Sequence, residues 1–402
     1  MRNDVIVIGA GAAGLAAAES LSAAGLKTLI LEARGRVGGR IYTVHEGGFS
    51  IELGAEFVHG KPPEILDLAG VGALPLKKPG GRNWFATEDG RIVPEGESGN
   101  EDEIWQKLEQ FSGEDISFTE FLKKYFAAPE FERARRSAAR YVEGFHAANP
   151  AEVSVRSLRK TERVTGSDDF RFEGGYENLA RLLCQRALEN GTELRTGEKV
   201  GTVQWREKQV EVGLADRSKS YLARCAVFTL PLGVWQAGQV SFEPGLPAEK
   251  EAALQKMKMG AVVRVSFRFW RNWWADLLRP NSDDKLGFLF SNDPDIPVWW
   301  TGEPVEANIL TGWAGGTQAE KIAGQGTDRL IVAAAESLAR IFKVERSFIE
   351  NETENVFTHD WQTDELACGS YSYILTGGIG APEILARPVD NTLFFAGSLV
   401  SR

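Results

Sequence analysis

The chain has 402 residues, and its 46 lysines and arginines against 56 aspartates and glutamates leave a formal net charge of −10. With 43% hydrophobic and 25% charged residues, the composition is that of a globular protein and excludes a wholly disordered or fibrous one. Phosphate binding needs a basic surface, so an acidic chain argues against a nucleic-acid partner. The length predicts about two or three domains.

Cysteine use and hydropathy favour a cytoplasmic location. Three cysteines, Cys184, Cys225 and Cys368, are too few and odd in number for a secreted disulfide framework, and they suit a reducing compartment. The apolar run at 5–8 is too short for a signal peptide, and no run of about 18 apolar residues follows anywhere. We therefore expect neither a membrane partner nor, from the residue pattern, a metal site.

The N-terminal residues predict a βαβ unit. An apolar strand is expected over residues 5–8, an Ala- and Leu-rich helix over 14–24 and a second strand over 27–31. A glycine-rich loop follows at 35–39.

A glycine motif, Gly9-x-Gly11-x-x-Gly14, lies between the first strand and the helix, and Glu32 ends the second strand. In such a motif the glycines allow a tight turn, close approach of a pyrophosphate and close packing of the helix. The acidic residue is placed to accept hydrogen bonds from a ribose hydroxyl. The motif predicts a dinucleotide site that includes Gly9, Gly11, Ala13, Gly14 and Glu32.

Helices are expected over much of the next hundred residues. Residues 95–103 are acidic and glycine-bearing, which predicts an exposed loop, and apolar residues recur at helical spacing from 104 to 145. This stretch carries four arginines, interpreted as a solvated helix face rather than a nucleic-acid surface: Arg133, Arg135, Arg136 and Arg140.

The remaining chain alternates between helix and strand patterns. The predicted elements are a helix at 179–188, short strands between 200 and 212, a buried strand at 226–231, a half-exposed strand at 262–269 and a final strand at 392–396. Most of the tryptophans between 270 and 313 are expected in the core.

The stretch from Glu32 to Arg40, Glu-Ala-Arg-Gly-Arg-Val-Gly-Gly-Arg, extends the first motif. Arg34 and Arg40 are suited to neutralise a diphosphate, and Gly38 and Gly39 allow close backbone contact. The stretch resembles the second FAD motif of the flavin-containing amine oxidase family, which includes polyamine oxidases and histone lysine demethylases. The resemblance covers the chain in order, with matching segments at 51–60, 175–182, 198–200, 229–234, 310–316 and 360–372.

The resemblance implies an α/β fold with a glutathione-reductase-like, Rossmann-type FAD-binding domain and an α+β substrate-binding domain, a mixed sheet flanked by helices. The FAD-binding domain is expected to comprise 1–75, 175–240 and 352–402, and the substrate-binding domain 76–174 and 241–351.

The family's site residues map onto the matching positions. By resemblance Gly39, Gly54, Ala55, Glu56, Val200, Trp361, Gly397 and Ser398 join the FAD contacts. Tyr371 would form one wall of an aromatic cage, since π faces attract cations and orient an amine lone pair. His59 is either a substrate-side histidine or a structural one, and Glu56 either places a carboxylate in the pocket or caps a turn.

The sequence departs from the family at three places. Many members carry a lysine that reaches flavin N5 through water, whereas Arg264 stands here and keeps its proton near neutrality. The cysteine to which monoamine oxidases attach flavin is Ser370 here, which predicts non-covalent FAD. Ser398 replaces a glutamate after the last strand, and the family's further loop and helix are not present, which suggests a shortened chain or a weakened flavin site.

The resemblance favours FAD-dependent oxidation of a primary amine or polyamine to an imine by hydride transfer to flavin N5, with Arg264, Tyr371 and His59 as the catalytic candidates. Molecular oxygen is the expected acceptor, giving hydrogen peroxide. Two alternatives remain: a related flavoprotein acting on an amino acid or a non-amine substrate, and a flavin-binding protein without activity.

Overall fold

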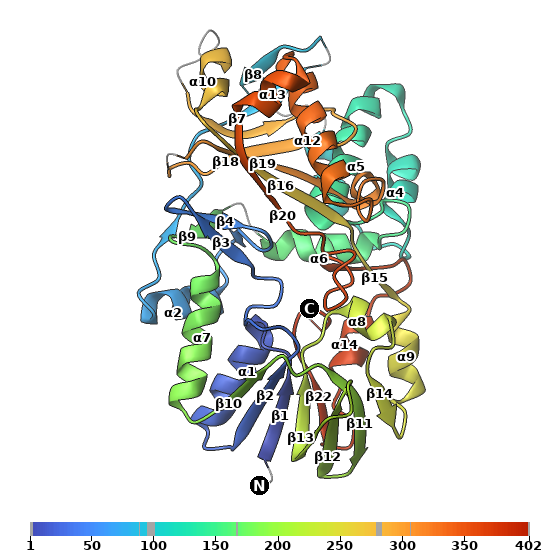
Figure 1. The fold of residues 1–402 in the computed structure, drawn as a ribbon. Helices are drawn as coiled ribbons and strands as arrows, with labels where there is room; N and C mark the ends of the chain where they lie inside the picture. The colour runs from blue at the N-terminus through green and yellow to red at the C-terminus, as the bar shows by residue number, and fades with distance from the viewer. Residues whose placement is uncertain are drawn as a thin grey trace.

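The computed structural model describes residues 3–87, 89–94, 101–165, 168–278, 284–305 and 307–400. Its two largest sheets lie at opposite ends of the molecule, and the C-terminal residues return to the region between them (Figure 1). Segments far apart in the sequence contribute to each sheet.

An eight-stranded sheet is built around the N-terminal strand. Its order is β10 (Glu193–Thr196), β2 (Thr28–Glu32), β1 (Asn3–Ile8), β13 (Ser220–Phe228), β12 (Gln209–Leu214), β11 (Val200–Arg206) and β14 (Ser241–Glu243), and β22 (Leu393–Phe395) also pairs with β13. β1 is parallel to both β2 and β13, and β22 is parallel to β13. The carboxyl ends of these strands therefore meet at one edge, and this edge faces the middle of the molecule (Figure 1).

Helices cover this sheet. α1 (Ala12–Ala23) and α7 (Glu177–Glu189) pack on one face through a core that includes Leu15 and Leu183. They correspond to the helices predicted at 14–24 and 179–188. Shorter helices accompany the strands that follow: α8 (Leu232–Gln236), α9 (Ala248–Leu254) and α14 (Ala381–Ala386).

A seven-stranded sheet occupies the other end of the molecule. Its order is β20 (Thr353–Thr358), β16 (Val262–Phe269), β19 (Ile309–Gly315), β18 (Val298–Thr301), β17 (Leu286–Phe290), β7 (Arg82–Ala86) and β8 (Ile92–Pro94). It is flanked by α10 (Trp273–Leu278), α11 (Gly316–Glu320), α12 (Thr327–Phe342) and α13 (Arg346–Glu352). Buried Trp273, Trp274 and Trp299 belong to its core as predicted, whereas Trp270 is 64% exposed.

The strand at Val262–Phe269 has the predicted bounds, but the prediction that it is half exposed is wrong. Only Arg268 among its residues is more than marginally accessible. Its apolar face packs in the tryptophan-containing core, while Arg264 and Ser266 are buried on the other face by partners from distant segments.

The helical region comprises α3 (Glu101–Glu109), α4 (Phe118–Tyr125), a 3₁₀ turn (Pro129–Phe131), α5 (Glu132–His146) and α6 (Val155–Thr165). The predicted loop at 95–103 is wrong for its last three residues, because the acidic Glu101, Asp102 and Glu103 form the first turn of α3, where carboxylates complement the helix dipole. Residues 95–100 lie outside the described residues. α4 begins with a capping box between Ser117 and Glu120.

Three small sheets join these parts. They are β3 (Thr43–Glu46) with β4 (Phe49–Glu52), then β5 (Val58–His59) with β9 (Asp169–Phe172) and β6 (Leu76–Lys77), and β15 (Met257–Met259) with β21 (Ser372–Ile374). α2 (Pro63–Val71) follows β5. Within the described ranges, none of the helices combines the length and the apolar character that crossing a membrane requires.

Candidate functional site

The turn between β1 and α1 has room only for glycine. Gly9 has a φ of +101°, and a Cβ there would lie 2.7 Å from Oγ1 of Thr229. A Cβ on Gly14 would lie 1.9 Å from the Gly9 carbonyl oxygen, so α1 packs directly on the turn. Gly11 is the N-cap of α1 and leaves the backbone N–H groups of the first helical turn available, which favours an anion at this point.

Two other segments approach the same turn. Gly38 forms a parallel bridge with Gly11, and a Cβ on Gly39 would lie 3.3 Å from Cα of Gly11. A Cβ on Gly397, which follows β22, would lie 3.4 Å from Cβ of Ala13. Six of the predicted cofactor residues therefore lie together although they come from three separate parts of the chain.

Glu32 is buried at the end of β2 and held by two backbone amides. Its Oε2 accepts a hydrogen bond from Ala10 N and its Oε1 accepts one from Arg34 N, both at 2.7 Å. The segment before β11 runs alongside, because Gly197 N donates to Arg34 O at 2.9 Å, and Val200 is buried at the start of that strand. The carboxylate and Val200 thus occupy neighbouring positions at the sheet edge.

The two arginines predicted at the diphosphate have different surroundings. Arg34 donates from Nη2 to Oδ1 of Asp364 at 2.8 Å, and His359 Nε2 lies 2.7 Å from the other oxygen of that carboxylate. Burial alone would raise the pKa of Asp364, but the hydrogen bonds from His359 and Arg34 hold it well below its ordinary value. The charge of Arg34 is therefore already balanced within the protein.

Arg40 has no carboxylate partner within the described part of the chain. It donates from Nη1 to the Ser370 carbonyl and from Nη2 to Oγ of Ser398 at 2.5 Å. Burial lowers its pKa to about 10, so it stays cationic near neutrality. Of the two arginines, Arg40 is the one whose charge is available to a diphosphate.

The next segment passes from Arg40 towards the substrate side. Ala55 N donates to the Arg40 carbonyl at 3.1 Å, and a Cβ on Gly54 would lie 1.9 Å from that oxygen. Trp361 is buried and donates from Nε1 to Leu53 O at 2.8 Å, and its ring would lie 3.1 Å from the same Cβ on Gly54. The segment is held flat against Arg40, and the Ala55 side chain is exposed.

Glu56 is the centre of a largely buried ionic cluster, which favours a carboxylate in the pocket over the cap of a turn. Its Oε1 lies 2.6 Å from Nε of Arg171, and its Oε2 accepts a hydrogen bond from Nη2 of Arg264. The indole N–H of Trp300 lies 3.2 Å from each oxygen. Burial would raise the pKa of Glu56, but the charges of Arg171 and Arg264 outweigh this effect and lower it.

Tyr371 and His59 meet at Phe145 on α5. The Tyr371 hydroxyl donates to the Phe145 carbonyl at 2.8 Å, and burial raises its pKa. The His59 ring lies edge-on to the Phe145 ring, with centroids 5.0 Å apart, and its Nδ1 lies 2.7 Å from Oδ1 of Asp169. The structure therefore brings these two catalytic candidates to the same residue, Tyr371 to its backbone carbonyl and His59 to its ring.

Further aromatic rings connect this position to the ionic cluster. The Phe57 ring lies 5.9 Å from His59 and 5.8 Å from Trp300, and Trp300 lies 6.1 Å from Trp313. Trp313 in turn donates from Nε1 to Gly144 O at 2.8 Å, beside Phe145. These rings form one aromatic array between the Gly54 segment and α5.

Sequence reasoning missed Arg171, Phe145 and Asp169. Arg171 and Asp169 are on β9, whose register places Asp169 opposite His59, but a four-residue strand in a mixed polar segment carries no local motif. The only signal for Phe145 was its place at the end of a helical pattern, where an aromatic residue ordinarily reads as core.

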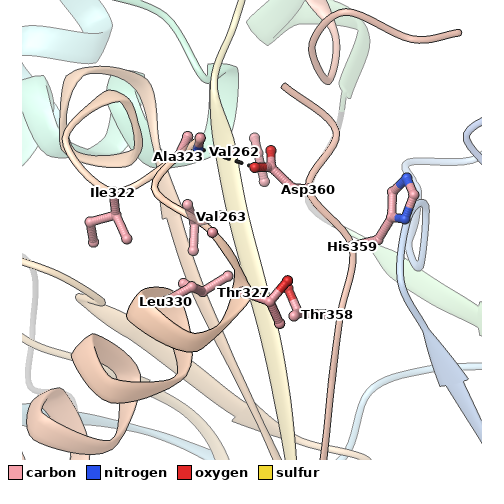
Figure 2. A pocket seen from close by; sticks show the side chains of 11 residues that line it. Val262, Val263, Ile322, Ala323, Thr327, Leu330, Thr358, His359 and Asp360 are labelled. Atoms are coloured by element: carbon pink, nitrogen blue, oxygen red, sulfur yellow. Dashed lines mark hydrogen bonds between the residues drawn. The ribbon is translucent and has the colours of Figure 1, made fainter. Parts of the chain in front are cut away.

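A small separate cavity lies behind β16 and contains none of the predicted site residues. Figure 2 shows Val262, Val263, Ile322, Ala323, Thr327, Leu330, Thr358, His359 and Asp360 around it. Its dashed hydrogen bond joins Gly324 N to Oδ2 of Asp360 at 3.1 Å. The cavity adjoins the site through two of its lining residues: Thr358 Oγ1 donates to the Arg264 carbonyl at 2.6 Å, and the His359 ring lies 4.3 Å from that of Trp361.

The chain matches the flavin containing amine oxidoreductase family over residues 12–402. It belongs to that family. Over 99% of its length it is 29% identical to lysine-specific histone demethylase 1 homolog 2 of Arabidopsis thaliana, of which it spans 55%. Over 98% of its length it is 27% identical to polyamine oxidase 3 of Oryza sativa subsp. japonica, of which it spans 84%. Its fold is that of wild-type putrescine oxidase bound to putrescine, with a TM-score of 0.83 at 20% identity, covering 100% of this chain and 94% of the other.

Membership confirms the predicted α/β fold class, with a Rossmann-type FAD-binding part and a substrate-binding part, and an oxidoreductase that acts on amines. The residues present fit a flavin dinucleotide. The turn at Gly9 and Gly14 excludes side chains, α1 offers free backbone N–H groups, and Arg40 offers an uncompensated charge.

Proposed function

We propose that this amine oxidoreductase binds FAD non-covalently, oxidises a primary amine or a polyamine to an imine, and uses molecular oxygen as the acceptor. One observation carries the proposal. Ala55 N donates to the Arg40 carbonyl, so the segment beside the glycine turn leads directly to His59, whose ring lies against Phe145 in the aromatic array.

Different residues of the protein would bind different parts of FAD. Arg40 and the N-terminus of α1 would hold the diphosphate, and Glu32 retains lone pairs for a ribose. Trp361 and Gly54 would present a flat surface to the ring system. Bound flavin would supply the redox chemistry: N5 would accept a hydride equivalent from the carbon next to the amine nitrogen, and reoxidation by oxygen would give hydrogen peroxide.

On the substrate side, Tyr371, Phe145 and His59 would orient the amine. The Tyr371 ring is fixed by its hydroxyl hydrogen bond, and a fixed π face favours an amine whose lone pair is correctly directed. His59 is paired with Asp169, which favours a positioning role. Holding the reacting carbon in place is mainly a gain in orientation.

Anaerobic mixing tests the activity. The flavin-loaded protein is mixed with putrescine, spermidine, benzylamine or tyramine, and bleaching of the flavin absorbance is followed before and after oxygen is admitted. We expect at least one amine to bleach the flavin and oxygen to restore its colour with formation of peroxide. Absence of bleaching by every amine contradicts the proposal, and bleaching without return of colour contradicts oxygen as the acceptor.

The proposal that FAD is bound non-covalently depends on the residue before Tyr371. Ser370 has no thiol, and the sulfur of Cys368 faces Gln239 Nε2 at 3.5 Å and Glu365 O at 3.3 Å. After precipitation with acid we expect all flavin in the supernatant. Flavin retained in the protein pellet would contradict this expectation.

A second candidate, oxidation of an amino acid, is favoured by one observation. Arg171 and Arg264 place two guanidinium groups around a single carboxylate, which suits a substrate carboxylate better than a second ammonium group. Adding amino acids to the anaerobic panel separates the two candidate functions. In an amino-acid oxidase the flavin would be bleached by the amino acids and not by the amines.

We also propose the domain limits and the location given by the sequence. FAD binding at 1–75, 175–240 and 352–402 is supported by the eight-stranded sheet, whose strands, apart from the short β14, come from these ranges. A cytoplasmic location is supported by Cys184, Cys225 and Cys368, all three of which are free thiols.

A further inference from the structure

We infer that Arg171, Glu56 and Arg264 form one charge-setting unit of the flavin site, in which Glu56 positions Arg264 and Arg171 keeps the net charge at plus one. The inference rests on the proposed flavin binding. It assigns a function to Arg171, which no sequence motif singles out, and explains why an arginine stands at position 264.

The three side chains are in direct contact, with Arg264 buried and the other two largely buried. Glu56 lies 2.6 Å from Nε of Arg171 and hydrogen-bonded to Nη2 of Arg264, and the side chains are 10%, 15% and 4% exposed. Arg171 is anchored at its other nitrogens by the carbonyls of Glu303 and Thr301, each at 3.2 Å. Arg171 is on β9, Arg264 is on β16 and Glu56 lies in the loop between β4 and β5, so the contacts join three separate segments of the chain.

The unit lies against the segment assigned to the flavin ring. Arg264 Nη1 lies 3.4 Å from the carbonyl oxygen of Gly54, and its Nε has no hydrogen-bond partner within the described part of the chain. An orphaned guanidinium N–H that is this well buried is costly unless a further group accepts it. An acceptor on a ligand beside Gly54 would satisfy it.

The charge of the unit follows from its members. Two guanidinium groups and one carboxylate leave one positive charge, and low exposure leaves this charge weakly screened. Glu52 interacts electrostatically with both Glu56 and Arg264, but burial raises its pKa to about 7, so it is mainly protonated at pH 6. A positive charge beside a flavin stabilises its reduced, anionic form and the negatively charged adduct that sulfite forms with it.

Charge-changing variants test the inference on flavin-loaded protein at pH 6. Glu56→Gln raises the unit to plus two, and Arg171→Gln lowers it to zero. The double variant returns it to plus one while it removes both contacts. We measure the flavin reduction potential and the dissociation constant of sulfite, neither of which needs amine turnover.

We expect Glu56→Gln to tighten sulfite binding and raise the potential, and Arg171→Gln to do the opposite. Each change in sulfite affinity should be on the order of tenfold, as for a unit charge acting over about 10 Å. The double variant should return to within about twofold of the original. If the three residues had only a structural role, both single variants would shift sulfite affinity and potential in the same direction. The double variant would then deviate more than either single variant.

Two matched variants complete the design. Arg171→Lys keeps the charge and should leave both values unchanged, so the Lys and Gln variants at 171 decide the question even if Glu56→Gln does not fold. Arg346→Gln, which breaks the exposed pair with Glu350, should have no effect. Equal values in all flavin-loaded variants overturn the inference alone, whereas an original protein that binds no flavin overturns the proposed function as well.

Discussion

Arg34 and Asp364 form a largely buried ion pair between residues 330 positions apart, with Nη2 2.8 Å from Oδ1. The pair ties the loop after β2 to the segment that carries Trp361, and His359 on that segment lies against the second carboxylate oxygen. Arg34 thus joins the dinucleotide turn to the flavin-side tryptophan, where the sequence predicted only a diphosphate contact.

We predict that Asp364→Asn lowers the free energy of unfolding by about 3 kcal/mol, since it leaves the Arg34 charge buried without its partner. Urea unfolding at pH 7 measures this loss. Because the pKa of Asp364 is depressed in the folded protein, its contribution is present above the ordinary aspartate value of 3.8 and lost as the pH falls below it. The gap between the variant and the original should therefore narrow in acid. A loss no larger than that of Arg346→Gln, an exposed pair, would contradict the prediction.

Glu52 should make stability fall as the pH rises. Its carboxyl is buried between Thr43 and the backbone N–H of Tyr176, and burial raises its pKa from 4.5 to about 7. A raised folded-state pKa means that its contribution is full below pH 4.5 and is lost as the pH rises through 7. Glu52→Gln should therefore gain stability relative to the original protein between pH 5 and pH 8, by at most about 3 kcal/mol.

Thermal unfolding at the two pH values measures the Glu52 effect. The exposed Glu350→Gln serves as the control, because its difference from the original protein should be the same at both. A pH-independent difference for Glu52→Gln would show that the carboxyl stays ionised.

Arg40→Met should weaken FAD binding by about 10- to 100-fold, the range expected for loss of a charge-assisted hydrogen bond. Binding is measured by quenching of flavin fluorescence on titration of the apoprotein. Riboflavin, which has no diphosphate, should bind the variant and the original protein equally, and Arg40→Lys should recover part of the FAD affinity. Equal losses for riboflavin and FAD would show that Arg40 acts on the fold instead.

Tyr371→Phe and Tyr371→Ala separate the ring from the hydroxyl. The Phe variant loses the hydrogen bond to the Phe145 carbonyl, worth about 1 kcal/mol of stability, but keeps the π face. The Ala variant loses both, and we expect its kcat/KM for the best amine to fall on the order of tenfold. Steady-state kinetics with the Phe variant as reference decide the matter. A loss of the same size in both variants would assign the effect to the hydroxyl.

Local chemistry made much of the dinucleotide side predictable. Gly9, Gly14 and Glu32 stand at fixed spacings around one turn. The lack of space for side chains and the hydrogen bonds of that turn therefore involve residues that are close together in the sequence. The parallel strands around it are apolar runs, so their burial follows from composition.

The substrate side was less predictable because its contacts join distant segments. Arg171 meets Glu56 only through the pairing of β9 with β5, and Arg34 meets Asp364 across the whole chain. The burial of Arg264 reversed the prediction of a half-exposed strand, since a pattern of alternating polarity cannot show that a buried carboxylate faces the polar side.

The position of β1 has a consequence for biosynthesis. Asn3 pairs with Ala223, about 220 residues later, and β22 completes the sheet only after another 170 residues or so. At roughly 5–20 residues per second, the first strand leaves the ribosome some ten to forty seconds before its neighbour β13. During that interval an apolar strand and its glycine turn have only β2 to pair with, so nascent chains should depend on chaperones that shield exposed strand edges.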